Sequence, residues 1–185
     1  MDHQNGTDRA PDHSDVARSR HEIDGTRPAA LVTEFHDVYQ MPDRIRDHHG
    51  STLDYERLSM RMGLIAEETA ELFAAVYGPR AGRAILDGVA LATESDEGTR
   101  DVVEAADALA DLVYVIYGMA LESGIDLDAV LAEVHSSNLS KLMPDGSVLR
   151  REDGKVLKGP GFRQPNISAV IEERDSRVQD PTRQN

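Results

Sequence analysis

Residues 101–118, DVVEAADALADLVYVIYG, constrain the fold more than any other stretch, because at helical spacing they are apolar around most of the circumference. A helix of this kind is normally buried. Three carboxylates interrupt the pattern at i, i+3 and i+7, which places Glu104, Asp107 and Asp111 in one line along one side. Since unpartnered buried carboxylates are unfavourable, we expect positive charge opposite this line, either arginines of a neighbouring helix or a bound cation.

A second acidic group lies upstream, in the segment LIAEETAEL. Glu68 and Glu71 are three residues apart on a predicted helix, and this spacing repeats that of the first two carboxylates of 101–118. Two such pairs facing each other would make a nest of oxygen ligands, the kind that Mg²⁺ takes in proteins while it bridges to substrate phosphates. Taken alone, the upstream acidic string is also typical of a solvated helix face. The stronger indication of a cation site is therefore the apolar helix around the carboxylates of residues 101–118.

The amino-acid composition limits which classes of protein and site are possible. The chain has 185 residues, which favours one domain, and its low aromatic content of 4% suits a core of packed aliphatic helices. The absence of cysteine excludes disulfides, thiolate zinc sites and cysteine nucleophiles. A net charge of −14 argues against nucleic-acid binding. No apolar run reaches membrane-spanning length and the N-terminus has no apolar signal core, so we expect no membrane association and a cytoplasmic location.

Apolar periodicity divides the chain into three parts. Residues 1–28 and 174–185 are polar, and we expect a disordered leader and a disordered tail. Residues 29–173 form the predicted domain, which is all-α apart from a short C-terminal hairpin or loop arm around the turn dipeptides Asp145-Gly146 and Asp153-Gly154. The helices are predicted at residues 29–40, 53–77, 80–92, 101–122, 127–142 and 167–174.

Polar and cationic side chains gather where the apolar face of the predicted helix 127–142 ends. Asn138 and Lys141 lie at its C-terminal end, and Lys155 and Lys158 project from the predicted arm. A lysine at a helix C-terminus is stabilised by the helix dipole, which is a purely structural explanation. The functional explanation is that these cations bind a chain of phosphates. The sequence has no glycine-rich phosphate loop that would do so instead.

The acidic motifs resemble those of the all-α NTP pyrophosphatase superfamily, which includes MazG, the dimeric dUTPases and the phosphoribosyl-ATP pyrophosphohydrolases. Glu67-Glu68-x-x-Glu71 followed by Glu104-x-x-Asp107 is similar to the EExxE…ExxD signature of that group. The combination with a matching C-terminal segment makes the resemblance more specific than either motif alone.

That C-terminal segment is similar to the tail of the MazG-like dUTPases, through EVHSSNLSK and then DGKVLKGPGF. Phe162 stands where the tail often has tryptophan, which is a departure from the pattern. The resemblance covers roughly residues 30–173 and leaves the N-terminal leader outside it.

The resemblance implies a MazG-like helical bundle that assembles as a homodimer or homotetramer. It also implies an enzyme that uses Mg²⁺, with Mn²⁺ as a substitute, to split a nucleoside triphosphate into the monophosphate and pyrophosphate. The implied metal ligands are Glu68, Glu71, Glu104 and Asp107, with Glu67 as a further ligand or as the base that orients water. The implied substrate contacts are Asn138, Lys141, Lys155 and Lys158, with Lys141 also catalytic, and Phe35 and His36 near the base pocket.

Other classes remain to be weighed. A di-iron bundle needs Glu-x-x-His on two helices, and here Glu133 precedes His135 by two positions. A non-enzymatic helical interaction module explains the helices but not the line of carboxylates, and it would be indifferent to Mg²⁺. Within the enzyme class, dUTP is the expected substrate, and purine deoxynucleotides such as dGTP or a broad range of NTPs are the alternatives. For Phe35 and His36, a core aromatic beside an exposed histidine is the structural alternative.

Overall fold

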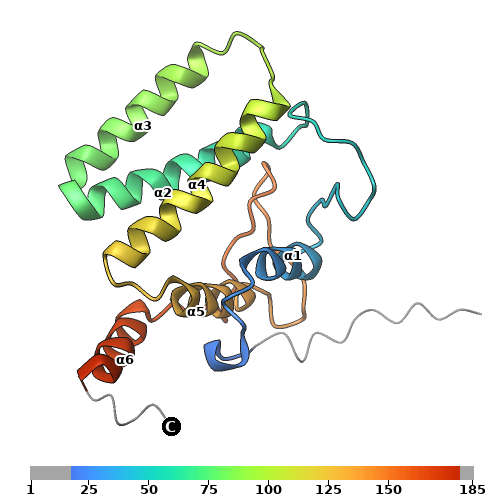
Figure 1. The fold of residues 1–185 in the computed structure, drawn as a ribbon. Helices are drawn as coiled ribbons and strands as arrows, with labels where there is room; N and C mark the ends of the chain where they lie inside the picture. Colours follow the sequence, from blue (N-terminus) through green and yellow to red (C-terminus); the bar gives the residue numbers. More distant parts are fainter. Residues whose placement is uncertain (1–17, 180–185) are drawn as a thin grey trace, which may run out of the picture. The chain divides into compact units, whose positions relative to one another are not determined.

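The computed structural model describes residues 18–179, which form α-helices joined by loops and turns without a β-strand (Figure 1). The prediction of an all-α fold is therefore confirmed. The described chain divides into two compact units, each with its own packing. The terminal unit contains residues 18–43, 119–149 and 156–179, and the central unit contains residues 44–118 and 150–155.

In the central unit, α2 (Leu58–Tyr77) and α3 (Pro79–Glu94) form a tight helical pair. Gly78 joins them with a φ of +95°, a left-handed conformation that glycine adopts without strain. Gly82 lets the two helices approach closely, because a Cβ at this position would lie 2.7 Å from the carbonyl oxygen of Ala70. The small-residue face of α2 is therefore already occupied by α3.

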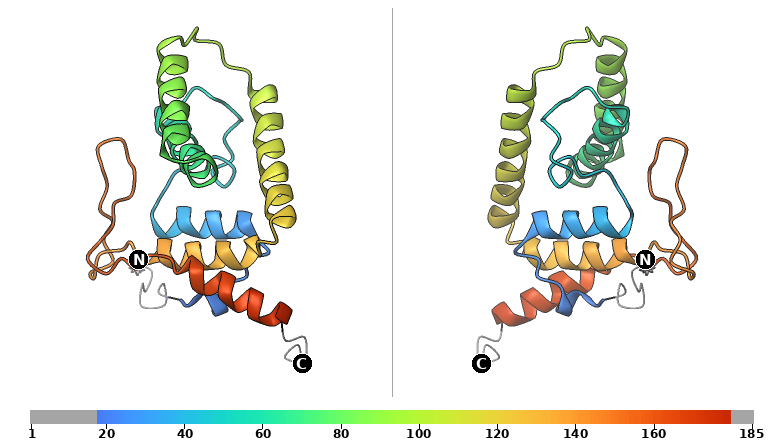
Figure 2. Two further views of the ribbon diagram at one scale, coloured as in Figure 1. Left: turned by 90° about the vertical axis from the view of Figure 1, so that its left-hand side faces the viewer. Right: turned by 90° about the vertical axis from the view of Figure 1, so that its right-hand side faces the viewer.

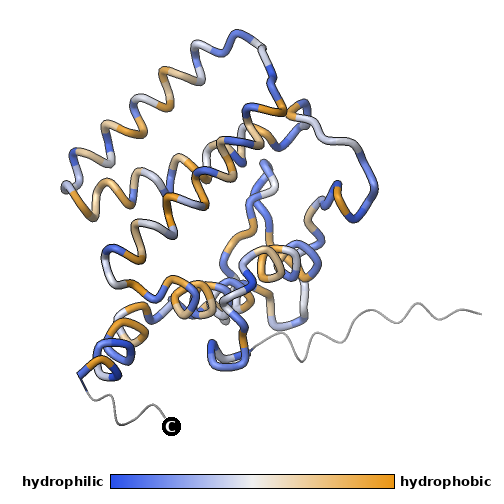
Figure 3. The backbone as a smooth tube through the Cα atoms, in the orientation of Figure 1, coloured by the Kyte–Doolittle hydropathy of each residue, from blue (hydrophilic) through white to orange (hydrophobic). Residues whose placement is uncertain are grey.

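The third helix of this region, α4 (Val102–Glu122), has no helix packed closely against it within the described residues. Figure 3 shows hydrophobic residues along most of its length. Leu109, Val115 and Ile116 are 51%, 61% and 49% exposed. The expectation that residues 101–118 form a buried helix is thus wrong for a single chain. The reason is topological, because α3 covers one face of α2 and the connection at 95–101 leads α4 to no second packed surface.

In the terminal unit, α1 (Pro28–Val38) and α6 (Ile167–Gln179) both pack on α5 (Leu127–Leu139), and Figure 2 shows α1 alongside α5. Asp126 caps α5, since its carboxylate accepts a hydrogen bond of 3.1 Å from the backbone N–H of Ala129. The C-terminal end of α5 is the most buried part of the unit, which positions the residues that follow it.

Part of the expected leader is ordered. Residues 18–27 include the short 3₁₀-helix η2 (Arg20–Glu22), and Ile23 is buried against Leu31 and Ala132. One apolar side chain in a polar stretch gave no periodic signal, yet its burial fixes this segment on the domain. At the other end, α6 continues to Gln179, beyond the predicted boundary at 173. Residues 1–17 and 180–185 of the predicted leader and tail lie outside the described residues.

The predicted arm is present as an irregular hairpin. The backbone N–H of Leu157 donates to the carbonyl of Leu149 at 2.8 Å, and that of Arg151 donates to the carbonyl of Lys155 at 2.9 Å. Gly154, with a φ of +87°, makes the turn between them. These few ladder bonds hold the arm closed without forming regular strands.

Candidate active site

The structure distributes the predicted site residues over both units. The terminal unit holds Phe35, His36, Asn138, Lys141 and Lys158. The central unit holds Glu67, Glu68, Glu71, Glu104, Asp107 and Lys155.

The two acidic pairs lie on exposed helix surface of α2 and α4. Each pair keeps its spacing of three residues, so both carboxylates of a pair lie on the same side of their helix. Carboxylate oxygens have the chemistry that a hard divalent cation requires. However, in residues 18–179 no group of three or more Asp, Glu, His or Cys side chains lies close enough to hold a metal ion. One chain therefore supplies the donor atoms but does not gather them.

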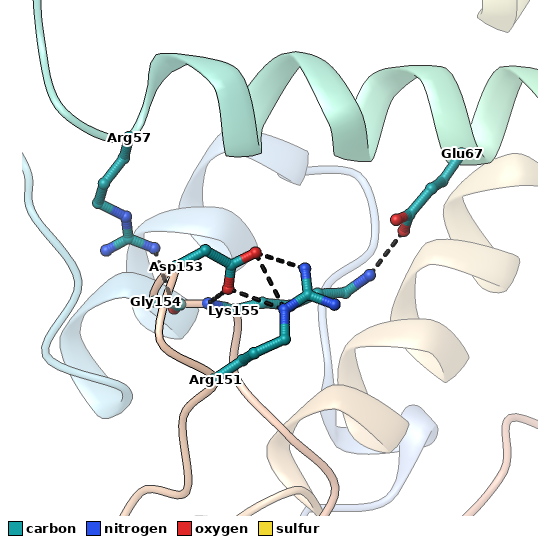
Figure 4. Close-up of polar contacts among 6 residues, drawn as sticks. All are labelled: Arg57, Glu67, Arg151, Asp153, Gly154 and Lys155. Atoms are coloured by element: carbon teal, nitrogen blue, oxygen red, sulfur yellow. Dashed lines mark hydrogen bonds and ion pairs between the residues drawn. The ribbon is translucent and has the colours of Figure 1, made fainter. Parts of the chain in front are cut away.

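Glu67 is held by the arm. The ammonium of Lys155 lies 2.6 Å from a carboxylate oxygen of Glu67, and Figure 4 shows this ion pair between the arm and α2. Two residues that were predicted from separate motifs, one as a base and one as a substrate cation, are thus in direct contact. The structure brings these two site residues together without any substrate.

A second contact fixes the tip of the arm. The guanidinium of Arg57, just before α2, donates a hydrogen bond of 3.2 Å to the carbonyl of Gly154 (Figure 4). Within the arm, Arg151 donates to the carboxylate of Asp153 at 3.0 Å, and these hydrogen bonds lower the pKa of Asp153 to about 2. Asp153 in turn accepts from the backbone N–H of Lys155 at 3.0 Å. The backbone around Lys155 is therefore held by two contacts, one from Arg57 to the Gly154 carbonyl and one from the Lys155 N–H to Asp153.

Arg57 was missed by the sequence analysis, although its environment is unusual. Burial lowers the pKa of Arg57, and the positive charges of Arg61 and Arg150 lower it further. Arg61 of α2 and Arg150 of the arm thus place positive charge near the guanidinium of Arg57, and the carboxylates of Asp153 and Glu56 act in the opposite direction. The only signal in the sequence was an arginine next to a helix start, which is too common to identify the contact.

In the terminal unit, Phe35, Tyr39 and Lys141 form a small cluster. The rings of Phe35 and Tyr39 are 4.4 Å apart between centroids, and the ammonium of Lys141 lies 5.8 Å from the Phe35 ring centroid. This distance is at the outer limit of a cation–π interaction. Phe35 is half-buried, so its ring is part of the packing and still reaches the surface. Two predicted substrate residues thus lie side by side.

Tyr39 is the buried anchor of this cluster. Its side chain is fully buried, and its hydroxyl donates to the carbonyl of Asn138 at 2.7 Å, with the carbonyl of Leu139 at 3.1 Å. Burial raises the pKa of Tyr39 to about 12. The tyrosine therefore fixes the backbone of Asn138 at the end of α5, three residues before Lys141. In the sequence it lies within the predicted helix 29–40 and carries no signal of its own.

A tight loop brings Lys158 to the same end of α5. The backbone N–H of Gly159 donates to the carbonyl of Lys141 at 3.0 Å, and a Cβ on Gly159 would lie 2.9 Å from that oxygen. The ammonium of Lys158 stacks over the ring of Phe162 at 4.4 Å. Lys141 and Lys158 therefore start from neighbouring backbone positions.

The two histidines near this end are engaged within the protein. A ring nitrogen of His36 lies 2.9 Å from the carbonyl oxygen of Pro42. His135 is buried and its Nε2 lies 3.0 Å from a carboxylate oxygen of Glu34, which also pairs with Arg18. His36 thus contacts the backbone just after its own helix, and its place near the base stays a prediction. The His135–Glu34 pair was not predicted, because the two residues are about a hundred positions apart.

No single helix in residues 18–179 is long and apolar enough to cross a membrane.

Comparison with known proteins agrees with these motifs. Residues 32–138 match the family described as phosphoribosyl-ATP pyrophosphohydrolase, a segment that includes both acidic pairs and ends at Asn138. A crystal structure from Exiguobacterium sp. 255-15, described as a candidate NTP pyrophosphohydrolase, superposes with a TM-score of 0.61 at 24% identity. The alignment covers 82% of this chain and 97% of that one, and at this identity the likeness concerns the fold. None of the curated proteins matches the chain.

Proposed function

Because the chain belongs to the phosphoribosyl-ATP pyrophosphohydrolase family, we propose that this nucleotide pyrophosphohydrolase is Mg²⁺-dependent and converts a nucleoside triphosphate to the monophosphate and pyrophosphate. The observation that carries this proposal is the family match over residues 32–138, which spans all four carboxylates of the two acidic pairs. The all-α fold agrees with it. Mg²⁺ is the expected cation because hard cations take carboxylate oxygens, and Mn²⁺ is the expected substitute.

The protein's own side chains have separate tasks in this proposal. Lys141 and Lys158, which start from neighbouring backbone positions, bind the phosphate chain and stabilise the negative charge that develops on pyrophosphate. Phe35 lies beside Lys141, where its half-buried ring can contact the base. Glu67 orients the attacking water, and its ion pair with Lys155 holds it in place before substrate binds.

The substrate that we propose first is dUTP, because the C-terminal segment around Asn138, Lys141 and Lys155 resembles that of the MazG-like dUTPases. Phosphoribosyl-ATP is the competing substrate suggested by the description of the matching family. Purine deoxynucleotides such as dGTP, or a broad range of NTPs, are the remaining options within the same chemistry.

A panel assay tests the proposal. The purified full-length chain is incubated with Mg²⁺ and each of the common NTPs and dNTPs, dUTP and phosphoribosyl-ATP, and pyrophosphate release is measured. We expect Mg²⁺-dependent pyrophosphate release that is fastest with dUTP. Release of orthophosphate alone, or no turnover of any nucleotide, would show that the proposed reaction is wrong. A chain indifferent to Mg²⁺ would favour an interaction module instead.

The proposal includes assembly into a homodimer or homotetramer. It is supported by the exposed apolar side chains of α4, among them Leu109, Leu112 and Ile116, which one chain leaves uncovered. Monomers of soluble proteins rarely expose contiguous apolar patches of this kind. Light scattering at micromolar concentration tests this part, and a compact, active monomer would contradict it.

A further inference from the structure

We infer that Ser137 and Ser140, at the C-terminal end of α5, are positioning residues for Lys158. They hold the loop of residues 159–163, and the ammonium of Lys158 lies against a ring of that loop. The inference deepens the proposed function and rests on it, because the contact of Lys158 with the phosphate chain is taken from there. It starts from two serine hydroxyls whose hydrogen bonds leave the helix and end on one loop residue, Arg163.

Both backbone groups of Arg163 are bound by serine side chains. The hydroxyl of Ser137 donates to the carbonyl oxygen of Arg163 at 2.7 Å. The backbone N–H of Arg163 donates to the hydroxyl oxygen of Ser140 at 2.9 Å. The two serines are three positions apart, so their side chains lie on the same side of the helix end. The end of α5 therefore holds the backbone of Arg163 at two points.

The direction of these hydrogen bonds follows from the chemistry of a hydroxyl group. The hydroxyl of Ser140 donates to the carbonyl of Ser137 at 2.6 Å. A hydroxyl has one hydrogen and two lone pairs, so the oxygen of Ser140 remains available to accept from Arg163. Ser137 is only 4% exposed, which leaves water little access to its own hydrogen bond. Ser140 thus connects the last turn of α5 to the loop.

The start of the loop is attached to the same end of α5. The backbone N–H of Gly159 donates to the carbonyl of Lys141 at 3.0 Å. Inside the loop, the N–H of Phe162 donates to the carbonyl of Gly159 at 3.1 Å. Hydrogen bonds therefore hold the loop at both ends, through Lys141 at its start and through the two serines at its end.

Phe162 connects this loop to Lys158. It directly precedes Arg163, and the ammonium of Lys158 lies 4.4 Å from the centroid of its ring, which is well within cation–π distance. A lysine side chain loses rotamer freedom when it binds a phosphate. Contact with a ring that is held in place restricts the lysine before substrate arrives, which lowers the entropic cost of binding. We therefore expect loss of the serine hydrogen bonds to weaken substrate binding.

A purely structural role of the serines is the alternative. The last carbonyls of a helix have no partner within the helix, and Ser140 supplies a donor to one of them. In that case a substitution at Ser140 would change stability without acting through Lys158. The two explanations differ in whether the effect of the substitution depends on Lys158.

A double-mutant cycle measures this dependence. Ser140→Ala removes the acceptor of the Arg163 N–H, and it is made alone and together with Lys158→Gln in the full-length chain. We expect Ser140→Ala to lower kcat/KM for the fastest nucleotide of the panel by about threefold to tenfold, mainly through KM, and to have almost no effect once Lys158→Gln is present. Ser140→Thr keeps the hydroxyl and should restore most of the loss. Ser137→Ala, which removes the donor to the Arg163 carbonyl, gives a second, independent cycle.

Ser136→Ala is the matched control. Ser136 is also buried on α5, and its hydroxyl donates to the carbonyl of Arg18 at 2.6 Å and accepts from the guanidinium of Arg163 at 3.2 Å. Any loss in this variant should be the same with and without Lys158→Gln. The inference is overturned if Ser140→Ala loses equally in both backgrounds or has wild-type kinetics. It is also overturned if Lys158→Gln is silent.

Binding of inorganic pyrophosphate in the presence of Mg²⁺, measured by calorimetry, keeps this inference apart from the proposed function. The same cycle with this probe needs no turnover. If the wild type hydrolyses no nucleotide but the cycle shows the dependence on Lys158, the positioning is supported and the reaction is wrong. If nucleotides are hydrolysed and the losses simply add, the reaction is supported and the positioning is wrong. A wild type that neither hydrolyses nucleotides nor binds pyrophosphate contradicts both.

Discussion

Lys155 of the arm and Glu67 of α2 form an ion pair of 2.6 Å, although they are 88 residues apart in the sequence. Both side chains are partly exposed, at 31% and 48%, so the pair contributes roughly 0–1 kcal/mol to stability. A contact this weak can be exchanged for a contact with a phosphate when substrate arrives. The ion pair therefore positions both residues without fixing them permanently.

The first prediction concerns this lysine. Lys155→Gln should raise KM several-fold and change kcat less, because it removes a cation that attracts the polyanionic substrate. The effect should shrink with added salt, since ions screen exposed charges. Steady-state kinetics at low and high salt provide the measurement. Arg151→Gln is the matched control, because Arg151 lies in the same arm and pairs with Asp153 rather than with Glu67. Equal effects of both variants would show that only the charge of the arm matters.

The second prediction concerns the acidic pairs. Alanine at Glu68, Glu71, Glu104 or Asp107 should abolish Mg²⁺-dependent hydrolysis. The thermal stability of the metal-free protein should be unchanged or higher, because like charges on neighbouring turns repel each other. Pyrophosphate release and thermal unfolding in EDTA are the two measurements. Asp111→Asn serves as the control on the same line of α4. Full activity in any two of the alanine variants would show that these carboxylates are not the site.

The third prediction concerns Lys141. Lys141→Gln should lower kcat/KM by about a hundredfold or more, because a lost charge-assisted phosphate contact costs on the order of 2–4 kcal/mol of transition-state stabilisation. The melting temperature should hardly change, because the long contact with the Phe35 ring contributes little to folding. Lys158→Gln, on the neighbouring loop, should have a smaller effect. If Lys141→Gln is kinetically silent, the lysine serves the helix end and not the substrate.

The fourth prediction concerns Tyr39, whose folded-state pKa is raised to about 12 by burial. In the unfolded chain the hydroxyl ionises near pH 10. Stability due to the neutral hydroxyl is thus fully present below pH 10 and is lost as the pH rises from about 10 to about 12. The loss should be on the order of 2 kcal/mol. Denaturant unfolding between pH 9 and about pH 12 measures it.

Tyr39→Phe separates this effect from general alkaline unfolding. The variant should be less stable at neutral pH by about 1–3 kcal/mol, because the carbonyl of Asn138 loses its buried hydrogen-bond donor. Its free energy of unfolding should also fall less steeply between pH 10 and about pH 12, since phenylalanine has no group to ionise. An unchanged slope in this variant would assign the pH dependence to other residues.

The sequence by itself determined the approximate positions of the helices and the residue types that are candidates for the site. Periodicity located the helices because side-chain spacing on a helix is fixed by local geometry, and the two acidic pairs followed from the same spacing. The cations after Asn138 were identified by their residue types alone. The helix ends were less accurate: α2 begins at Leu58, five residues after the predicted start, since a turn that Thr52 stabilises precedes it.

Only the tertiary structure decided what each of these parts contacts. The Lys155–Glu67 pair, the anchoring of Asn138 by Tyr39 and the burial of Ile23 depend on contacts between residues far apart in the chain. The spacing of residues within one helix contains no information on such contacts, because they depend on how the loops orient successive helices. The sequence indicated that α4 is a helix whose apolar side chains favour burial, and these side chains are indeed apolar around most of the helix. The topology of α2, α3 and α4 leaves that helix uncovered in one chain.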